Sequence, residues 1–271
     1  MDRRTVLASG VTLLGATELT LACVVKEHSN PSTFVLVHGT WHGGWVWRDV
    51  RNYLEDLGHR VFTPTLTGCG EREHLSSPAV GLETHIQDIV NVIEFEELNH
   101  IILVGHSFSG LAITGVADRL KNRIDHIVFF DAITPSATRK SGVPYEPDGS
   151  LPKWFLERQK YFLDGYKMVM WADYPVDMLV PPDSPQVARL KNLITTHPAK
   201  TWTDKLHLEN GGWQDMPRSF IHCIGQKFKQ SSEKMVGPAR KLGWNFIELD
   251  IPRDGMLTHP KLVADTLLAL K

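Results

Sequence analysis

Short apolar runs recur along most of the chain and are separated by stretches with helical spacing. Runs of four or five residues made mainly of branched and aromatic side chains are typical of strands that are buried on both faces. On this pattern we expect strands at residues 34–38, 61–65, 101–104, 127–130, 220–224 and 245–249.

Apolar residues repeat at helical spacing between these strands. This spacing predicts helices at residues 46–57, 82–96, directly after 107, near 231–242 and at 260–270. Strands that alternate with helices indicate the α/β class, with a mostly parallel sheet covered on both faces.

The alternation stops between about residues 134 and 218, a stretch rich in Pro, Trp, Tyr and Met with no convincing strand for the main sheet. We interpret it as an inserted helical cap. The chain has 271 residues, 42% of them hydrophobic, which is enough to bury one large core. Residues 31–271 are therefore expected to form one α/β domain that carries this cap.

Residues 1–30 differ from the rest of the chain. Arg3 and Arg4 precede an apolar run from 6 to 16, as in a twin-arginine export signal. Glu18 interrupts the run, however, and no Ala-x-Ala cleavage pattern follows. An export signal and a plain N-terminal extension both remain open, so the location is cytoplasmic or exported, and the run is too short for a stable membrane span.

The charge balance limits the partners. Lys and Arg total 29 against 31 Asp and Glu, so no strong field recruits nucleic acid or an anionic surface. A small apolar or aromatic substrate is expected instead, while the oligomeric state stays open. Cys23, Cys69 and Cys223 lack metal-ligand spacing, so we expect reduced thiols and neither a metal nor another cofactor.

The segment 104–110, VGHSFSG, places Ser107 between an apolar strand and a helix, with small residues around it. This is the context of a nucleophile elbow, in which a strained turn exposes the hydroxyl. Ser109 stands where glycine is usual, but serine is still small. Ser107 is therefore predicted to be a catalytic nucleophile.

The loop at residues 38–45, HGTWHGGW, follows the first strand. In a fold with such an elbow, this loop and the residue after the serine each supply one main-chain N–H to an oxyanion hole. Thr40 and Phe108 are the expected donors, while His38 and His42 are expected to order the loop. Two such donors suit cleavage of an ester, carbamate or amide.

Five segments carry a family resemblance over residues 33–271: HGTWHGGWVW, GCGEREHL, GHSFSG, FFDAITP and DGMLTHP. They resemble the esterase and hydroxynitrile-lyase-like branch of the α/β-hydrolase fold, and the chain as a whole is similar to bacterial carbendazim hydrolases, which cleave a methyl carbamate on a benzimidazole. The resemblance implies a cofactor-free serine hydrolase that forms an acyl-enzyme intermediate on a flat aromatic carbamate or ester.

The resemblance fails at the general base. Relatives carry a histidine in the turn after the last strand, but this chain has Arg253, which remains protonated and only donates. His259 is the only histidine beyond the last strand and is the preferred base; the alternative is that it only begins the final helix. His222 lies in an apolar strand and fits a core histidine better, and His207 on the cap remains open.

The acid is also displaced. Relatives place an aspartate after the strand at 220–224, where this chain has only Gly, Gln and Lys. Asp131, at the end of the preceding strand, occupies the alternative acid position of the fold and is predicted to orient the base. A capping role for Asp131 remains open, as does a pairing of Asp254 with Arg253.

Aromatic residues and methionines are concentrated in the cap, where some must form its core and others suit a planar apolar substrate. These residues are Trp154, Phe155, Tyr161, Phe162, Tyr166, Met168, Met170, Trp171, Tyr174 and Met178. Two alternatives to a hydrolase follow from Arg253 and the resemblance: a ligand-binding protein that has lost its base, and a hydroxynitrile-lyase-like enzyme.

Overall fold

A six-stranded sheet forms the centre of the molecule in a computed structural model, with strand order β2-β1-β3-β4-β7-β8 and every pairing parallel. The structure describes residues 31–270 apart from 137–138, 171–173, 226–235 and 237–238. The strands of the sheet are β1 (Thr33–Val37), β2 (Arg60–Phe62), β3 (Ile101–His106), β4 (Ile124–Phe130), β7 (Arg218–Cys223) and β8 (Asn245–Leu249). The predicted α/β class with a parallel sheet is confirmed.

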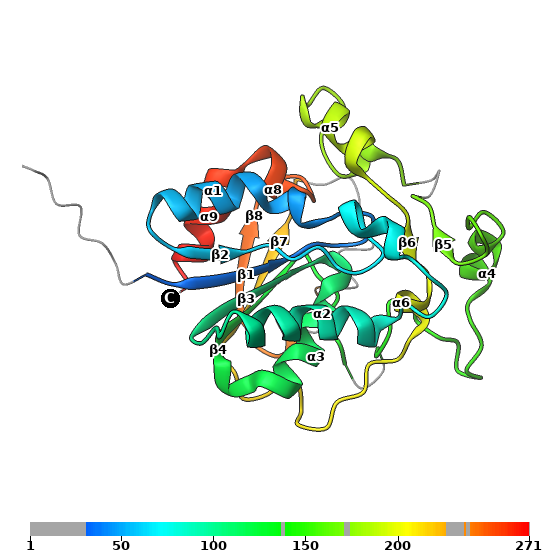
Figure 1. The fold of residues 1–271 in the computed structure, drawn as a ribbon, viewed down its shortest axis with the longest axis horizontal. Helices are drawn as coiled ribbons and strands as arrows, with labels where there is room; N and C mark the ends of the chain where they lie inside the picture. Colours follow the sequence, from blue (N-terminus) through cyan, green and yellow to red (C-terminus); the bar gives the residue numbers. More distant parts are fainter. Residues whose placement is uncertain (1–30, 137–138, 171–173, 226–235, 237–238, 271) are drawn as a thin grey trace, which may run out of the picture.

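Helices cover both faces of this sheet, as Figure 1 shows. One face is covered by α1 (Arg48–Asp56), α8 (Gly255–Thr258) and α9 (Pro260–Leu268), and the other by α2 (Leu82–Phe95) and α3 (Gly110–Leu120). Short 3-10 helices are η1 (Gly44–Trp47), η2 (Gly70–Leu75), η3 (Ser107–Ser109) and η4 (Lys121–Arg123).

Two hydrophobic layers result from the alternation of side chains along each strand. In β1, Phe34 and Leu36 pack with α1 and α9, whereas Val35 and Val37 pack with α2 and α3. All four side chains are fully buried. Burial on both faces explains why these strands appear in the sequence as continuous apolar runs.

The chain leaves the sheet after β4 and returns to it at β7. The described part of this segment contains α4 (Lys153–Gln159), β5 (Lys167–Met168), η5 (Val176–Met178), α5 (Gln186–Leu193), β6 (His197–Pro198) and α6 (Lys200–Thr203). Within this segment β5 and β6 pair with each other, antiparallel and apart from the main sheet. In Figure 1 these elements lie together at one end of the sheet, as expected for an inserted cap.

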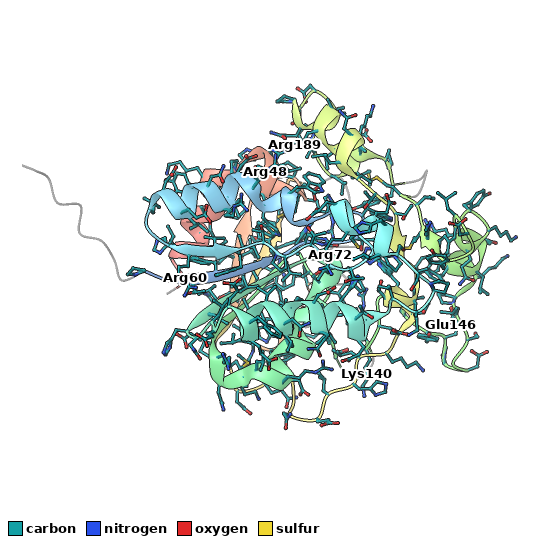
Figure 2. All side chains as sticks on the ribbon, in the orientation of Figure 1. Arg48, Arg60, Arg72, Lys140, Glu146 and Arg189 are labelled. Carbon is teal, nitrogen blue, oxygen red and sulfur yellow. The ribbon has the colours of Figure 1, made fainter. Side chains whose placement is uncertain are left out.

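An ion pair joins the cap to the body at α5. Nη1 of Arg189 lies 2.6 Å from Oδ2 of Asp49 on α1, and the guanidinium also lies over the ring of Trp45. Figure 2 shows Arg189 and the neighbouring Arg48 on this side of the molecule. The carboxyl end of β1 and the cap are thereby held close together.

The second strand and the first helix differ in their bounds from the sequence prediction, and two other predicted segments are not tested. The second strand ends at Phe62 rather than at 65, since Pro64 has no N–H for a sheet bond. The first helix begins with the turn η1 at Gly44. The helix expected near 231–242 and the N-terminal segment 1–30 lie largely or wholly outside the described residues. Among the helices that are described, none has the length and hydropathy needed to cross a membrane.

Candidate active site

Ser107 lies at the sharp turn between β3 and α3, where its φ of 56° is in the left-handed region. This conformation is costly for a residue with a side chain, so surrounding contacts must hold it. The carbonyl of Ser107 accepts a bond of 2.8 Å from the N–H of Ile133, just beyond β4. The elbow predicted from sequence is present as a strained turn.

The loop after β1 packs directly against this turn. A Cβ atom on Gly39 would lie 2.9 Å from Cβ of Ser107, so only glycine allows the two backbones to approach this closely. The hydroxyl of Ser109 donates to the carbonyl of His38 and ties the loop to the start of α3. The structure thus brings Thr40, the expected donor, into the immediate neighbourhood of Ser107.

His38 fixes the orientation of the Gly39–Thr40 peptide. Its Nδ1 donates to the carbonyl of Gly39 at 2.8 Å, while its Nε2 accepts from the N–H of Leu66 at 3.0 Å. Burial lowers the pKa of His38 to about 3, so the ring is the neutral tautomer that this pair of bonds requires. Because a trans peptide points its N–H away from its carbonyl, the N–H of Thr40 faces away from His38.

Arg253 occupies the position next to the nucleophile. Its Nη2 donates to Oγ of Ser107 at 2.8 Å, and its Nη1 pairs with Oδ2 of Asp131. Asp131 is fully buried, with a φ of 44° directly after β4. The three side chains form a row, Asp131–Arg253–Ser107, in which a guanidinium stands between the carboxylate and the hydroxyl.

The guanidinium in this row cannot take up a proton. Burial alone would lower the pKa of Arg253, but interactions with Tyr174, Asp131 and Asp254 outweigh it and raise the pKa above its ordinary value. Arg253 therefore stays charged and acts only as a donor. It stabilises negative charge on the oxygen of Ser107 without relaying a proton.

The structure places the candidate histidines elsewhere. His259 is exposed at the start of α9, with its Nδ1 2.8 Å from the hydroxyl of Thr258. His222 is buried in β7 and His207 is exposed. In the part of the chain that the structure describes, Oγ of Ser107 is bonded to Arg253 and to no histidine, so the expected contact between His259 and Ser107 is replaced by the contact with Arg253.

A second buried pair lies beside the row. Nε2 of His42 lies 2.8 Å from Oδ2 of Asp254, and both side chains are buried. The sequence left open a pairing of Asp254 with Arg253, but Arg253 pairs with Asp131 and Asp254 pairs with His42. Sequence reasoning missed this contact; the only signal for it was a carboxylate directly after the position of the missing base.

Cap aromatics lie close to the elbow. Trp202 stacks on Phe108 at 5.7 Å between ring centroids, and its Nε1 donates to Oγ1 of Thr40 at 3.1 Å. Tyr174 lies 5.9 Å from Trp41, and burial raises the pKa of Tyr174 to about 12. Both Trp202 and Trp41 were found from the structure as neighbours of the site, and neither was among the cap residues singled out from sequence.

Other cap residues serve different purposes. Phe155, Phe162 and Met168 are buried within the cap, which assigns them to its core. Tyr161 is 73% exposed, and Trp171 lies outside the described residues. Three of the cap residues singled out from the sequence therefore belong to the cap core and not to a substrate wall.

Two cysteines lie in the described part of the chain, and Cys223 adjoins the row through the bond from its main-chain N–H to Oδ1 of Asp131, at 3.4 Å. Cys69 and Cys223 are buried and, among the residues that the structure describes, are in no disulfide; burial raises the pKa of both thiols. Among the residues whose placement is described, no group of three or more His, Cys, Asp and Glu side chains has an arrangement that could hold a metal ion.

Comparison with known proteins places these features in a family. The model of the family described as "Alpha/beta hydrolase family" matches residues 34–265. A carbendazim hydrolyzing esterase of Nocardioides sp. (strain SG-4G) is 57% identical over 104 residues, which is 38% of this chain and 43% of that protein. The match thus spans less than half the length of this relative.

Two further relatives match over longer stretches. Methylesterase 2 of Arabidopsis thaliana is 28% identical, over 73% of this chain and 80% of the relative. A solved structure titled as an extracellular alpha/beta-hydrolase from a Paenibacillus species aligns with a TM-score of 0.74 and 25% identity, covering 89% of this chain and 99% of that one. The names of such relatives support the expectation of an ester hydrolase.

Proposed function

Because the chain belongs to the alpha/beta hydrolase family, we propose that it cleaves a carboxylic ester or carbamate of a small aromatic molecule with Ser107 as the nucleophile. The observation that carries the proposal is the strained backbone of Ser107, φ 56°, held against the loop that contains Thr40. A hydroxyl so placed is exposed to a carbonyl carbon beside main-chain donors.

The reaction divides into two steps. Oγ of Ser107 attacks the carbonyl carbon, and the N–H groups of Thr40 and Phe108 stabilise the oxygen that becomes negative. Collapse of this intermediate expels the alcohol, phenol or amine and leaves an acyl or carbamoyl group on Ser107. Water then attacks the same carbon, releases the acid and regenerates the hydroxyl.

Proton transfer from Ser107 is expected to limit the rate at this site. The charge of Arg253 favours the alkoxide form of Ser107, but the proton must leave to solvent because Arg253 cannot accept it. Serine hydrolases that lack one triad member retain about 10³–10⁴-fold catalysis over water through the oxyanion hole and substrate binding. We therefore expect slow turnover, with a preference for leaving groups such as phenols that need no proton.

Substrate preference follows from the surroundings of Ser107. Trp202 of the cap and Trp41 of the loop lie next to the donor Thr40. The hydroxyl of Tyr174, which is close to Trp41, remains protonated at neutral pH. Such walls favour a flat apolar ring over a charged chain. The relative named as a carbendazim hydrolyzing esterase supports an aryl carbamate as the first substrate to test.

The test is turnover of 4-nitrophenyl acetate and of an aryl methyl carbamate by the wild type and by Ser107→Ala. We expect the substitution to lower both rates and to leave only the catalysis that the oxyanion donors and substrate binding support. Ser150→Ala, which removes an exposed hydroxyl bonded to Asp148, is the matched control and is expected to keep full activity. Undiminished turnover by Ser107→Ala would refute the proposal.

A second candidate function is binding without turnover, and the position of Arg253 against Ser107 favours it. A fluorophosphonate probe separates the two functions, because it reacts with a serine that is a working nucleophile. Labelling of Ser107, located by mass spectrometry of the peptide, supports the hydrolase. A wild-type chain that binds aromatic carbamates but is neither labelled nor active would instead be a binding protein.

A further inference from the structure

We propose that His42 and Asp254 are positioning residues, which fix the position of the oxyanion donor Thr40 relative to Arg253 and Ser107. The two residues lie 212 positions apart and meet beneath the site, where His42 contacts Asp254 at 2.8 Å. The proposal rests on the proposed function and assigns a role to a buried pair that the hydrolysis itself does not use.

Each nitrogen of the His42 ring faces a hydrogen-bond acceptor. Its Nδ1 lies 2.7 Å from the carbonyl oxygen of Thr40, and its Nε2 lies 2.8 Å from the carboxylate of Asp254. Both partners are acceptors, so both ring nitrogens must carry protons. Burial opposes this charge, but the charge of Asp254 and the two hydrogen bonds outweigh it and raise the pKa of His42.

Main-chain hydrogen bonds anchor the Asp254 end of the pair. The N–H of Asp254 donates to the carbonyl of Leu179 in the cap at 3.0 Å, and its own carbonyl accepts from Leu257 at 2.9 Å. Asp254 also directly follows Arg253 in the chain. The carboxylate is therefore fixed to the same turn that sets the position of the guanidinium.

His42 holds the loop in a strained turn at Trp41. Trp41, between Thr40 and His42, has a φ of 67°, which is a strained conformation for a bulky residue. The bond from Nδ1 of His42 to the carbonyl of Thr40 closes this tight turn. His38 sets the orientation of the Gly39–Thr40 peptide, and His42 holds the peptide that follows it. Release of the His42 bond leaves the N–H of Thr40 held from one side only, so its distance to the developing oxyanion changes.

Charged and titratable groups face His42 from three directions. Asp254 and Arg253 face it from the turn after β8. His38 faces it from the same loop and His106 from β3, and the charge of His42 also acts on His197 of the cap. Burial lowers the pKa of His38, His106 and His197, so these rings stay neutral and leave Asp254 as the partner of the imidazolium.

Two substitutions of His42 separate its two bonds. His42→Asn keeps an amide near the position of Nδ1, within reach of Thr40, whereas His42→Gln keeps one near the position of Nε2, within reach of Asp254. A misplacement of about 1 Å costs about 10²-fold in rate. We expect His42→Gln to lower kcat by up to about this factor with little change in KM, and His42→Asn to lower it less.

The matched control is His100→Asn. His100 forms a similar contact with Asp125, at 3.1 Å, but its side chain is 86% exposed and remote from Ser107. We expect this variant to keep the wild-type kcat. A folded His42→Gln protein with wild-type kcat, or equal losses in both His42 variants, would overturn the positioning role.

Asp254→Asn provides a second test if the His42 variants do not fold. The amide removes the charge that keeps His42 protonated, so the ring loses its proton at a lower pH. We expect kcat of Asp254→Asn to fall at a lower pH than kcat of the wild type, again with little change in KM. Identical pH profiles for kcat would overturn the proposal.

Binding of phenylboronic acid distinguishes failure of this proposal from failure of the proposed function. The boron takes up the oxygen of Ser107 with loss of its proton to solvent, and one boron hydroxyl then lies at the oxyanion donors. We expect His42→Gln to bind it more weakly and His100→Asn to bind it as the wild type does. Equal affinity for all three rejects the positioning role, whereas absent turnover with intact binding rejects only the hydrolase.

Discussion

At the scale of single residues, a guanidinium stands where an imidazole would relay a proton. Arg253 is only 5% exposed and bonds to both Asp131 and Ser107, so it is held in place as a donor. A positive charge 2.8 Å from the hydroxyl favours the alkoxide, but Arg253 cannot take up the proton that the hydroxyl then releases.

The position of His259 leads to a prediction at this scale. His259→Ala is expected to keep the wild-type rate on 4-nitrophenyl acetate, because the ring is exposed and contacts Thr258 rather than Ser107. The rate is measured beside that of Ser107→Ala. A loss as large as that caused by Ser107→Ala would restore His259 as the general base.

Local spacing predicted some residues of the site and not others. Ser107 was predictable because an apolar strand, a serine between small residues and a helix follow one another directly. Asp131 was predicted at the end of its strand. Contacts between distant parts of the chain, such as Arg253 with Ser107 over 146 positions and His42 with Asp254, depend on how the turns fold together and leave no local pattern.

At the scale of elements, the start of α3 packs closely against the segment after β4 and so sets the position of Ser107. A Cβ on Gly110 would lie 2.1 Å from the carbonyl oxygen of Ile133, whose N–H holds the carbonyl of Ser107. The helix can approach the segment after β4 only because residue 110 has no side chain. This close approach couples the elbow to the strand that carries Asp131.

Gly110→Ala is therefore expected to destabilise the fold and to lower activity. Alanine favours a helix over glycine by about 1 kcal/mol, but overlap with a backbone carbonyl forces a shift that costs about 1–3 kcal/mol or more. Urea unfolding measures the change. Gly115→Ala on the same helix is the control, because its new methyl group meets the end of the flexible Ile86 side chain, and a smaller loss is expected there.

Most elements could be predicted from the sequence because their apolar runs are uninterrupted. The strand expected at 245–249 has those bounds in β8, whereas β4 begins at Ile124, three residues before the apolar run, because it pairs there with β3. Pairing extends a strand through exposed positions such as Asp125 that carry no hydrophobic signal.

At the scale of the whole molecule, Asp118 fastens the chain where it returns from the cap to the sheet. Its carboxylate on α3 accepts main-chain N–H bonds from Glu209, Asn210 and Gly212, at 2.8–2.9 Å. Burial alone would raise the pKa of Asp118, but these three donors outweigh it and lower the pKa. The charged form therefore stabilises the folded state.

This arrangement predicts a pH-dependent stability. A carboxyl whose pKa is lower in the folded chain stabilises it fully above the unfolded pKa, and this stabilisation is lost as the pH falls through the folded pKa. Asp118→Asn, which leaves one acceptor for three donors, is expected to reduce the free energy of unfolding by about 1–3 kcal/mol at neutral pH. The difference in free energy of unfolding between this variant and the wild type is expected to become smaller in acid. Thermal unfolding of both proteins at several pH values measures it, and a difference that does not change with pH would contradict the prediction.

The central claim is that Ser107 is a nucleophile whose base position is occupied by Arg253, and Arg253→His tests it most directly. An imidazole there lies between Asp131 and Ser107, and general base catalysis contributes about 10²–10⁴-fold. The measurement is the rate of 4-nitrophenyl acetate hydrolysis against pH for both proteins. We expect a faster variant whose rate levels off above the pKa of the new imidazole, whereas the wild-type rate shows no such plateau and rises with pH until His42 loses its proton. A folded Arg253→His protein that is no faster than the wild type at any pH would contradict it.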